Sequence, residues 1–288
     1  MTRLNKVLAI VLRVLLAVLF FVSSLAKLLA IDDFELYIFS YGFFSLNLSY
    51  IVARLCIAAE FLLGLFIALG WWKRWVNLLT LVVLFLFSFF LCYAAMVGRT
   101  DSCQCMGRLV DLDPAQSLLK NAVLIVLVLL YSRWSTDSDK GGTLKLVLTV
   151  VFVLGVTAGV FGLSVPDNWM FGPEESRYNK ELLEESISPD GLLAADSLTT
   201  GNHLVAFVTP GCPYCKMSRQ KITSIAQRNH LDTTRIHYYE PDDLGDTLFL
   251  RITFGQRPFI VMLADGKPCV TYHYRNINER QITKYLKQ

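Results

Sequence analysis

The sequence predicts an α-helical membrane bundle, with a four-helix core and a fifth membrane-spanning helix, followed by an α/β domain. Three observations lead to this expectation. The chain has 288 residues and is 54% hydrophobic, which is more than is usual in soluble proteins. Its apolar residues concentrate in residues 1–165, whereas residues 166–288 have the composition of a soluble domain. That second part is long enough to bury a core of its own.

Five apolar stretches of the first part are candidates to cross a bilayer, which takes about 20 residues in a helix. The fourth is the shortest, and we expect its helix to start near Pro114, because proline suits a first helical turn. The first stretch also fits a cleaved signal peptide, although Arg13 within it and Lys27 near its end argue against cleavage. The stretches are residues 7–29, 50–70, 76–97, 117–131 and 144–163.

The distribution of Lys and Arg predicts how these spans are oriented, because cytoplasmic loops are rich in cations. The N-terminus and the loops after the second and fourth spans carry most of the cations, and the opposite loops are mostly acidic. We therefore expect a bacterial inner-membrane protein with a cytoplasmic N-terminus and a periplasmic C-terminal domain. The net charge is only +3 and no long basic run is present, so nothing indicates a nucleic-acid partner. The cations of the predicted cytoplasmic side are Arg3, Lys6, Lys73, Arg74, Arg133, Lys140 and Lys145.

Two pairs of cysteines fall on the predicted extracytoplasmic side, where disulfides form and are exchanged. Cys103 and Cys105 lie in the loop between the third and fourth spans, and Cys212 and Cys215 lie in the C-terminal domain. Each pair is close enough in sequence to alternate between dithiol and disulfide. The disulfide of a C-x-C pair closes a very small ring, so it should be strained and comparatively oxidising. The alternative is that Cys103 and Cys105 are two unpaired loop cysteines.

The C-terminal domain reads as an alternation of strands and helices around the second cysteine pair. A strand at 203–208 runs into the pair, and a helix follows to about residue 229. The last elements are two strands joined as a hairpin by residues 264–267, and a final helix. The expected elements are a connector helix at 174–185, strands at 203–208, 235–239, 259–263 and 270–274, and helices ending at 229, at 243–254 and at 278–286.

This domain resembles the thioredoxin/glutaredoxin superfamily over residues 187–288. The resemblance rests on Cys212-Pro-Tyr-Cys215 between a strand and a helix, and on Arg257-Pro258 before the next strand. It implies that Pro258 follows a cis peptide bond and packs against the active disulfide. Two departures are that Ala206 replaces the buried acid of thioredoxins and that Gly211 replaces the tryptophan before the motif.

The position of Cys212 at the start of a helix predicts its chemistry. Unpaired backbone N–H groups and the helix dipole favour a thiolate there. Cys212 is therefore the expected attacking thiol, and Cys215, one turn later, is the expected resolving thiol. A structural disulfide and half of a zinc site are the alternatives. Zinc-finger spacing is absent from the cysteines and histidines of the domain, so no metal is expected.

The membrane part resembles the DoxX/MauE family of redox-associated membrane proteins over residues 7–134. The matching features are the run from Arg13 to Lys27, Glu60-Phe-Leu-Leu-Gly64, the segment Cys103-Gln-Cys-Met-Gly107, and Asn121. The resemblance implies a four-helix bundle that serves disulfide chemistry. It also implies a quinone as the candidate electron acceptor, although no motif marks a site for it. No covalently bound cofactor is expected.

Charged residues inside predicted spans are candidates for function. Counted along the helices, Arg13 and Glu60 lie at similar depths and could form an ion pair, either structural or catalytic. Lys27 and Arg54 lie toward the outer edge, where either could stabilise a thiolate of the C-x-C loop. Lys27 could instead extend to the membrane interface.

Two further cysteines and three glycines complete the membrane candidates. Cys56 and Cys92 lie near the outer edge and could form a second redox pair, or could be ordinary buried apolar residues. The fifth span should pack closely through its small residues, which are Gly155, Gly159 and Gly162.

Together these expectations describe three segments: residues 1–134 as the membrane domain, 135–186 as the fifth span with a polar linker, and 187–288 as the thioredoxin-like domain. The predicted function is a membrane-bound thiol–disulfide oxidoreductase. Its C-x-C pair would exchange electrons with the C-P-Y-C pair, which would oxidise dithiols of extracytoplasmic client proteins. The alternatives are a periplasmic disulfide reductase or isomerase, a client-specific assembly factor with secondary redox activity, and a transporter.

Overall fold

The computed structural model describes residues 3–97, 113–134, 142–167, 177–188, 190–193 and 198–287. The chain divides into two compact units. The first contains Met1–Tyr37 and Ile51–Ser164, and the second contains Ile38–Tyr50 and Val165–Gln288. Two of the three boundaries between the units fall inside helices, and the third lies after Ser164.

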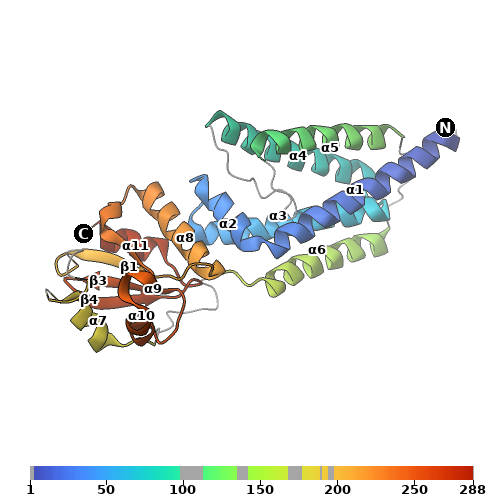
Figure 1. The fold of residues 1–288 in the computed structure, drawn as a ribbon. Helices are drawn as coiled ribbons and strands as arrows, with labels where there is room; N and C mark the ends of the chain where they lie inside the picture. Colours follow the sequence, from blue (N-terminus) through green and yellow to red (C-terminus); the bar gives the residue numbers. More distant parts are fainter. Residues whose placement is uncertain are drawn as a thin grey trace. The chain divides into compact units, whose positions relative to one another are not determined.

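The first unit is helical (Figure 1). The helices are α1 (Arg3–Leu29), α2 (Ile31–Ser40), α3 (Leu46–Leu69), α4 (Lys73–Met96), α5 (Pro114–Trp134) and α6 (Thr143–Leu163), and the ends of α2 and α3 nearest each other belong to the second unit. All except α2 are long and apolar enough to cross a membrane, which confirms the five predicted spans. Helix α5 begins at Pro114, as its sequence predicts.

Helix α2 was not predicted, because its acidic residues were interpreted as part of a loop between two spans. Asp32 and Asp33 lie in its first turn, where carboxylates interact favourably with the helix dipole. Glu35 is buried and forms an ion pair with Arg54 of α3. At ten residues the helix is too short to cross a bilayer, so a search for membrane-spanning stretches passes over it.

The core of the first unit lies among α1, α3, α4 and α5, around residues such as Leu16, Phe20 and Val128. Gly64 allows α1 and α3 to approach closely, because a β-carbon there would lie 3.1 Å from Cβ of Phe20 and 3.3 Å from the carbonyl oxygen of Ala17. Helices α4 and α5 lie side by side.

The expected small-residue packing of α6 is wrong within the part of the chain that the structure describes. Among the described residues, no atom beyond the local backbone of α6 lies within 4 Å of where a β-carbon would stand on Gly155, Gly159 or Gly162. Small residues permit close packing, but they do not specify which helix face has a neighbour. Helix α6 buries only Val160 among its described residues.

The second unit is built on a four-stranded sheet with the order β2-β1-β3-β4. Strand β1 (Asn202–Phe207) pairs parallel to β2 (Ile236–Tyr239) and antiparallel to β3 (Phe259–Ala264), and β3 pairs antiparallel to β4 (Lys267–Tyr272). Asp265 and Gly266 turn the hairpin with φ values of 47° and 76°, as a two-residue type I′ turn requires. The predicted order of strands and helices is confirmed.

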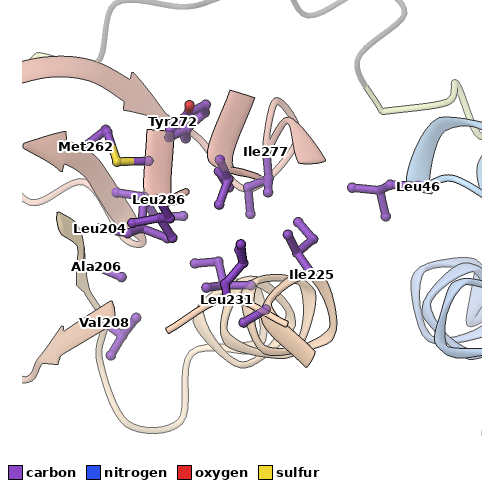
Figure 2. Close-up of a cluster of buried hydrophobic side chains, with 14 of the residues drawn as sticks. Leu46, Leu204, Ala206, Val208, Ile225, Leu231, Met262, Tyr272, Ile277 and Leu286 are labelled. Carbon is purple, nitrogen blue, oxygen red and sulfur yellow. The ribbon is translucent and has the colours of Figure 1, made fainter. Parts of the chain in front are cut away.

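Helices cover both faces of this sheet, because alternate residues of a strand point to opposite sides. On one face, Leu204, Ala206 and Met262 pack against α8 (Pro213–Asn229) and α11 (Glu279–Leu286) (Figure 2). On the other face, Val205, Phe207 and Val261 pack against α7 (Lys180–Ile187) and α10 (Asp246–Thr253). Two apolar clusters therefore hold the sheet in the middle of a three-layer unit.

Three predicted boundaries of this unit are wrong for identifiable reasons. The connector helix starts at residue 180 rather than 174, because Asn179 caps it by accepting a hydrogen bond from Leu182 N–H. The helix predicted at 243–254 is divided at Gly245, with φ of 77°, into α9 (Pro241–Leu244) and α10. Strand β4 starts at 267 rather than 270, because it is an edge strand, where a proline such as Pro268 is tolerated.

Candidate redox and membrane sites

The C-P-Y-C motif lies where β1 gives way to α8, as its sequence predicts. Gly211 adopts a φ of 76°, which turns the chain so that Cys212 becomes the N-cap of α8 and Pro213 its first residue. The Cys212 sulfur accepts a hydrogen bond from the Cys215 backbone N–H, with 3.3 Å between N and Sγ. A thiolate at this place would be stabilised by that N–H and by the dipole of the helix.

The two cysteines differ in burial and therefore in chemistry. Cys212 is half-buried, whereas Cys215 is only 3% exposed. Burial raises the pKa of the Cys215 thiol to about 12, and its contact with Cys212 adds to the increase. Cys215 therefore stays protonated at neutral pH, which leaves Cys212 as the thiol that can meet another molecule.

The predicted proline has the backbone geometry that the resemblance implies. The peptide bond between Arg257 and Pro258 is cis, as the resemblance to thioredoxins implies, and Pro258 is buried. The charge of Arg257 acts to lower the pKa of Cys215 and offsets part of the effect of burial. This interaction shows that the loop before β3 is close to the cysteines. The role of Pro258 in disulfide exchange stays a prediction.

An aromatic surface adjoins the motif. Tyr214, between the two cysteines, is 45% exposed and stacks on Tyr274, with 4.4 Å between the ring centroids. The guanidinium of Arg275 lies 5.3 Å from the centroid of the Tyr274 ring. Next to Cys212, the second unit thus presents aromatic rings and a cation, which suit contact with a polypeptide.

A buried lysine of α8 was not predicted. Lys221 is fully buried, and its Nζ donates to Asp167 Oδ2 at 2.7 Å and to the Tyr274 carbonyl oxygen at 3.2 Å. Nζ also lies 5.4 Å from the centroid of the Tyr50 ring. The sequence did contain a signal for this burial. Helical spacing places Lys221 on the same face of α8 as Ser218 and Ile225, next to Ile222. A lysine on an apolar helix face indicates a buried partner.

The C-x-C pair lies outside the described residues. Cys103 and Cys105 belong to residues 98–112, so their predicted redox role and their predicted proximity to Arg54 stay predictions.

Glu60 pairs with Lys27 of α1, and not with Arg13 as the sequence suggested. Both carboxylate oxygens of Glu60 lie 2.7 Å from Lys27 Nζ, which also donates to Ser23 Oγ at 2.8 Å. Ser23 in turn donates to Glu60 Oε2 at 3.1 Å. Lys27 is 2% exposed, so it does not extend to the interface. The sequence suggested Arg13 because counting residues gives the position of a side chain along its own span. It does not give the relative shift of two spans along their axes.

Arg13 and Arg54 donate hydrogen bonds to carbonyl groups at the ends of helices. Arg13 donates through Nε to the carbonyl oxygens of Ile67 and Ala68, at 3.0 and 3.1 Å, in the last turn of α3. Besides its ion pair with Glu35, Arg54 donates to the carbonyl oxygen of Ser164 at the end of α6. The last carbonyls of a helix lack intrahelical partners and attract cations. Both contacts thus account for these charges structurally.

The other two membrane cysteines are free thiols in the structure. Cys56 of α3 is half-buried, and Cys92 of α4 is exposed on the protein surface. Cys56 and Glu60 are four residues apart on one helix and so share a face. A redox role for Cys56 and Cys92 stays a prediction.

A cavity of about 410 Å³ opens among α1, α3, α4 and α5 of the first unit. Its walls are mainly apolar, and they include Leu84, Phe87, Leu124 and Leu127. The buried Lys27–Glu60 pair lies in its wall. Its polar lining residues are Ser23, Lys27, Glu60, Gln116, Lys120 and Asn121.

Comparison with known proteins finds two similarities. Residues 5–133 match the family model of methylamine utilisation protein MauE. Protein TlpB of Flavobacterium psychrophilum is 23% identical over an alignment of 264 residues, which covers 75% of this chain and 72% of the relative. No solved structure matches the chain significantly. The chain is therefore a multi-pass membrane protein whose membrane helices are similar to MauE and which is similar to TlpB over most of its length, with an α/β domain after its membrane helices.

Proposed function

We propose that this chain is a membrane-bound thiol–disulfide oxidoreductase whose C-terminal unit oxidises dithiols of extracytoplasmic client proteins. The observation that carries the proposal is the unequal cysteine pair, with half-buried Cys212 at a helix N-cap and Cys215 buried behind it. This arrangement lets one sulfur meet a partner while the other stays within reach to complete the exchange.

The proposed reaction starts from the Cys212–Cys215 disulfide. A client thiolate attacks Sγ of Cys212, and Cys215 leaves and takes up a proton, because its raised pKa keeps it protonated. The client's second thiolate then attacks its own mixed disulfide and releases Cys212. The client has lost two electrons, and the C-P-Y-C pair has gained them.

The reduced pair is reoxidised by the disulfide of Cys103 and Cys105, in the same two steps. Cys212 attacks that disulfide, and Cys215 resolves the mixed disulfide after losing its proton. The distribution of cations, which predicts that both pairs are extracytoplasmic, supports this order. Because both pairs are on one chain, their encounter is intramolecular and benefits from a high effective concentration.

The experiment traps the internal intermediate in the full-length protein. In a Cys215→Ala variant, Cys212 has no resolving thiol and should remain bonded to Cys103 or Cys105. After acid quenching and alkylation of membranes, mass spectrometry of non-reduced peptides should find this crosslink. The matched control, Cys212→Ser, should not form it. If client adducts of Cys212 accumulate without any crosslink to the C-x-C loop, the internal exchange is disproved.

The redox state of the pair in growing cells tests the direction of electron flow. An oxidase keeps Cys212 and Cys215 mainly oxidised, whereas a reductase or isomerase keeps them mainly reduced.

A separate experiment tests the alternative that the chain is a client-specific assembly factor. If a Cys103→Ser/Cys105→Ser protein still matures its client, binding rather than exchange is the main activity.

A further inference from the structure

The cavity in the first unit has the size of a small-molecule site. Its volume of about 410 Å³ falls within the range of about 300–1,000 Å³ that is usual for such sites. Leu119 and Val123, which line it, are 69% and 52% exposed on the surface of α5. That surface belongs to a membrane-spanning helix, so the cavity is open to a ligand that arrives through the lipid.

The chemistry of the cavity is that of a mainly apolar site with a few polar groups. In its wall, Lys27 is held by Glu60 and Ser23 in a buried cluster. Asn121 is 4% exposed, and its Nδ2 makes a 3.4 Å contact with Ser88 Oγ. A ligand with an apolar body and hydrogen-bonding oxygen atoms fits such a lining.

Lys120 supplies a second cation. It lines the cavity and is half-buried, and it forms no ion pair or hydrogen bond within the described part of the chain. With Lys27, Lys120 and Glu60, the described residues of the lining carry two positive charges and one negative charge. A surplus of positive charge in a low-dielectric site favours a ligand whose oxygen atoms become more negative when it is reduced.

We propose that this cavity binds a lipid-soluble quinone, with Lys120 and Asn121 as donors to its oxygen atoms and the Lys27–Glu60 pair as its inner wall. The inference deepens the proposed function, on which it rests, because it names the acceptor class and its site. In the overall step, the thiols of Cys103 and Cys105 lose two electrons and two protons and form an S–S bond. The quinone receives both electrons and both protons and becomes a quinol.

The first test measures binding alone, with the full-length protein in lipid nanodiscs and a tritium-labelled ubiquinone that carries one isoprene unit. Lys120→Gln removes a charged donor without breaking a described contact, and should weaken binding by about tenfold or more. Val123→Phe should block the cavity mouth and abolish measurable binding. Val126→Phe is the matched control, because Val126 lies on the same helix with a similar exposure of 54% but does not line the cavity.

The second test locates the ligand. A photoreactive azidoquinone should label peptides of α1, α3, α4 or α5, and the Val123→Phe variant should lose this label while keeping the thermal unfolding midpoint of the parent. The proposal is overturned if the quinone does not bind, if it labels other helices, or if Val123→Phe and Val126→Phe bind it equally. Displacement of the label by phospholipid but not by unlabelled quinone would identify a lipid site and would also overturn it.

A Cys103→Ser/Cys105→Ser variant separates this inference from the function on which it rests. It should bind the quinone as the parent does but should form no quinol when a dithiol peptide is supplied. Normal binding with equal quinol formation by both proteins would disprove the proposed function and leave the site standing. Absent binding in a parent protein that still exchanges disulfides would disprove the site alone.

Discussion

The buried thiol of Cys215 controls how the C-P-Y-C pair completes an exchange. To resolve a mixed disulfide on Cys212, this thiol must lose a proton, and burial holds its pKa at about 12. Ala206, at the position of the buried acid in thioredoxins, is itself fully buried and has no group that could accept the proton. Resolution should therefore be the pH-dependent part of the cycle.

Alkylation of the reduced protein should separate the two cysteines. At neutral pH, iodoacetamide should modify Cys212 and leave Cys215 unmodified, because Cys215 is both buried and protonated. As the pH rises toward 12, the thiolate fraction of Cys215 grows, and its labelling should increase. Peptide mass spectrometry of the two thiols reports each rate. Equal labelling at pH 7 would contradict the assigned roles.

Removal of one partner of the ion pair between Lys221 and Asp167 should strongly destabilise the second unit. Lys221→Met leaves the Asp167 carboxylate, with a side chain only 10% exposed, without its cation. Loss of one partner of a buried pair costs about 3–5 kcal/mol. Hydrogen exchange of the β1 amides in the full-length protein should be faster by the corresponding factor.

The control for that loss is the double variant Lys221→Met/Asp167→Leu, which replaces both charges by apolar groups. Such replacements are often neutral, so protection of β1 should return toward that of the parent. If the double variant is as unstable as the single one, packing of the lysine stem rather than the charge pair carries the stability.

At the level of elements, Gly64 sets the approach of α1 and α3. Gly64→Leu should force these helices apart and destabilise the first unit by about 1–3 kcal/mol, as overpacking usually does. Gly155→Leu, on α6, is the control, because its β-carbon meets no described atom. Thermal unfolding in detergent should show a lower midpoint for the first variant only. Equal losses would mean that the close approach of α1 and α3 at Gly64 is not responsible.

The elements also show what the sequence can predict. The length of an apolar stretch indicates a membrane span, and alternation of apolar and polar residues indicates a strand. The five spans and the order of the α/β unit were therefore predictable. Helix α2 was not, because it is short and acidic. The Lys27–Glu60 pair was missed because it depends on how far α1 and α3 are shifted along each other. That shift is set by their packing and cannot be read from residue spacing. Asp167 lies far from Lys221 in sequence, and only the folded unit joins them.

At the scale of the whole molecule, the orientation in the membrane is the prediction with most consequences. If the cations mark the cytoplasmic side, a membrane-impermeant maleimide should label Cys212 in intact spheroplasts. A cysteine introduced as Lys73→Cys, in a variant whose native cysteines other than Cys215 are serine, should be labelled only after the membrane is permeabilised. The opposite pattern would invert the orientation and place the C-P-Y-C pair in the cytoplasm.

The interleaving of the two units has a practical consequence for anyone who wishes to study the C-terminal part separately. A recombinant fragment of residues 187–288 would lack Asp167, and also Phe39, Leu46 and Tyr50, which belong to the apolar cluster of the second unit. Its Lys221 would be buried without a carboxylate, and an apolar surface would be uncovered. We expect such a fragment to be aggregation-prone. A fragment that starts at Val165 and is supplied with a peptide of residues 38–50 should recover monomeric behaviour in size-exclusion chromatography.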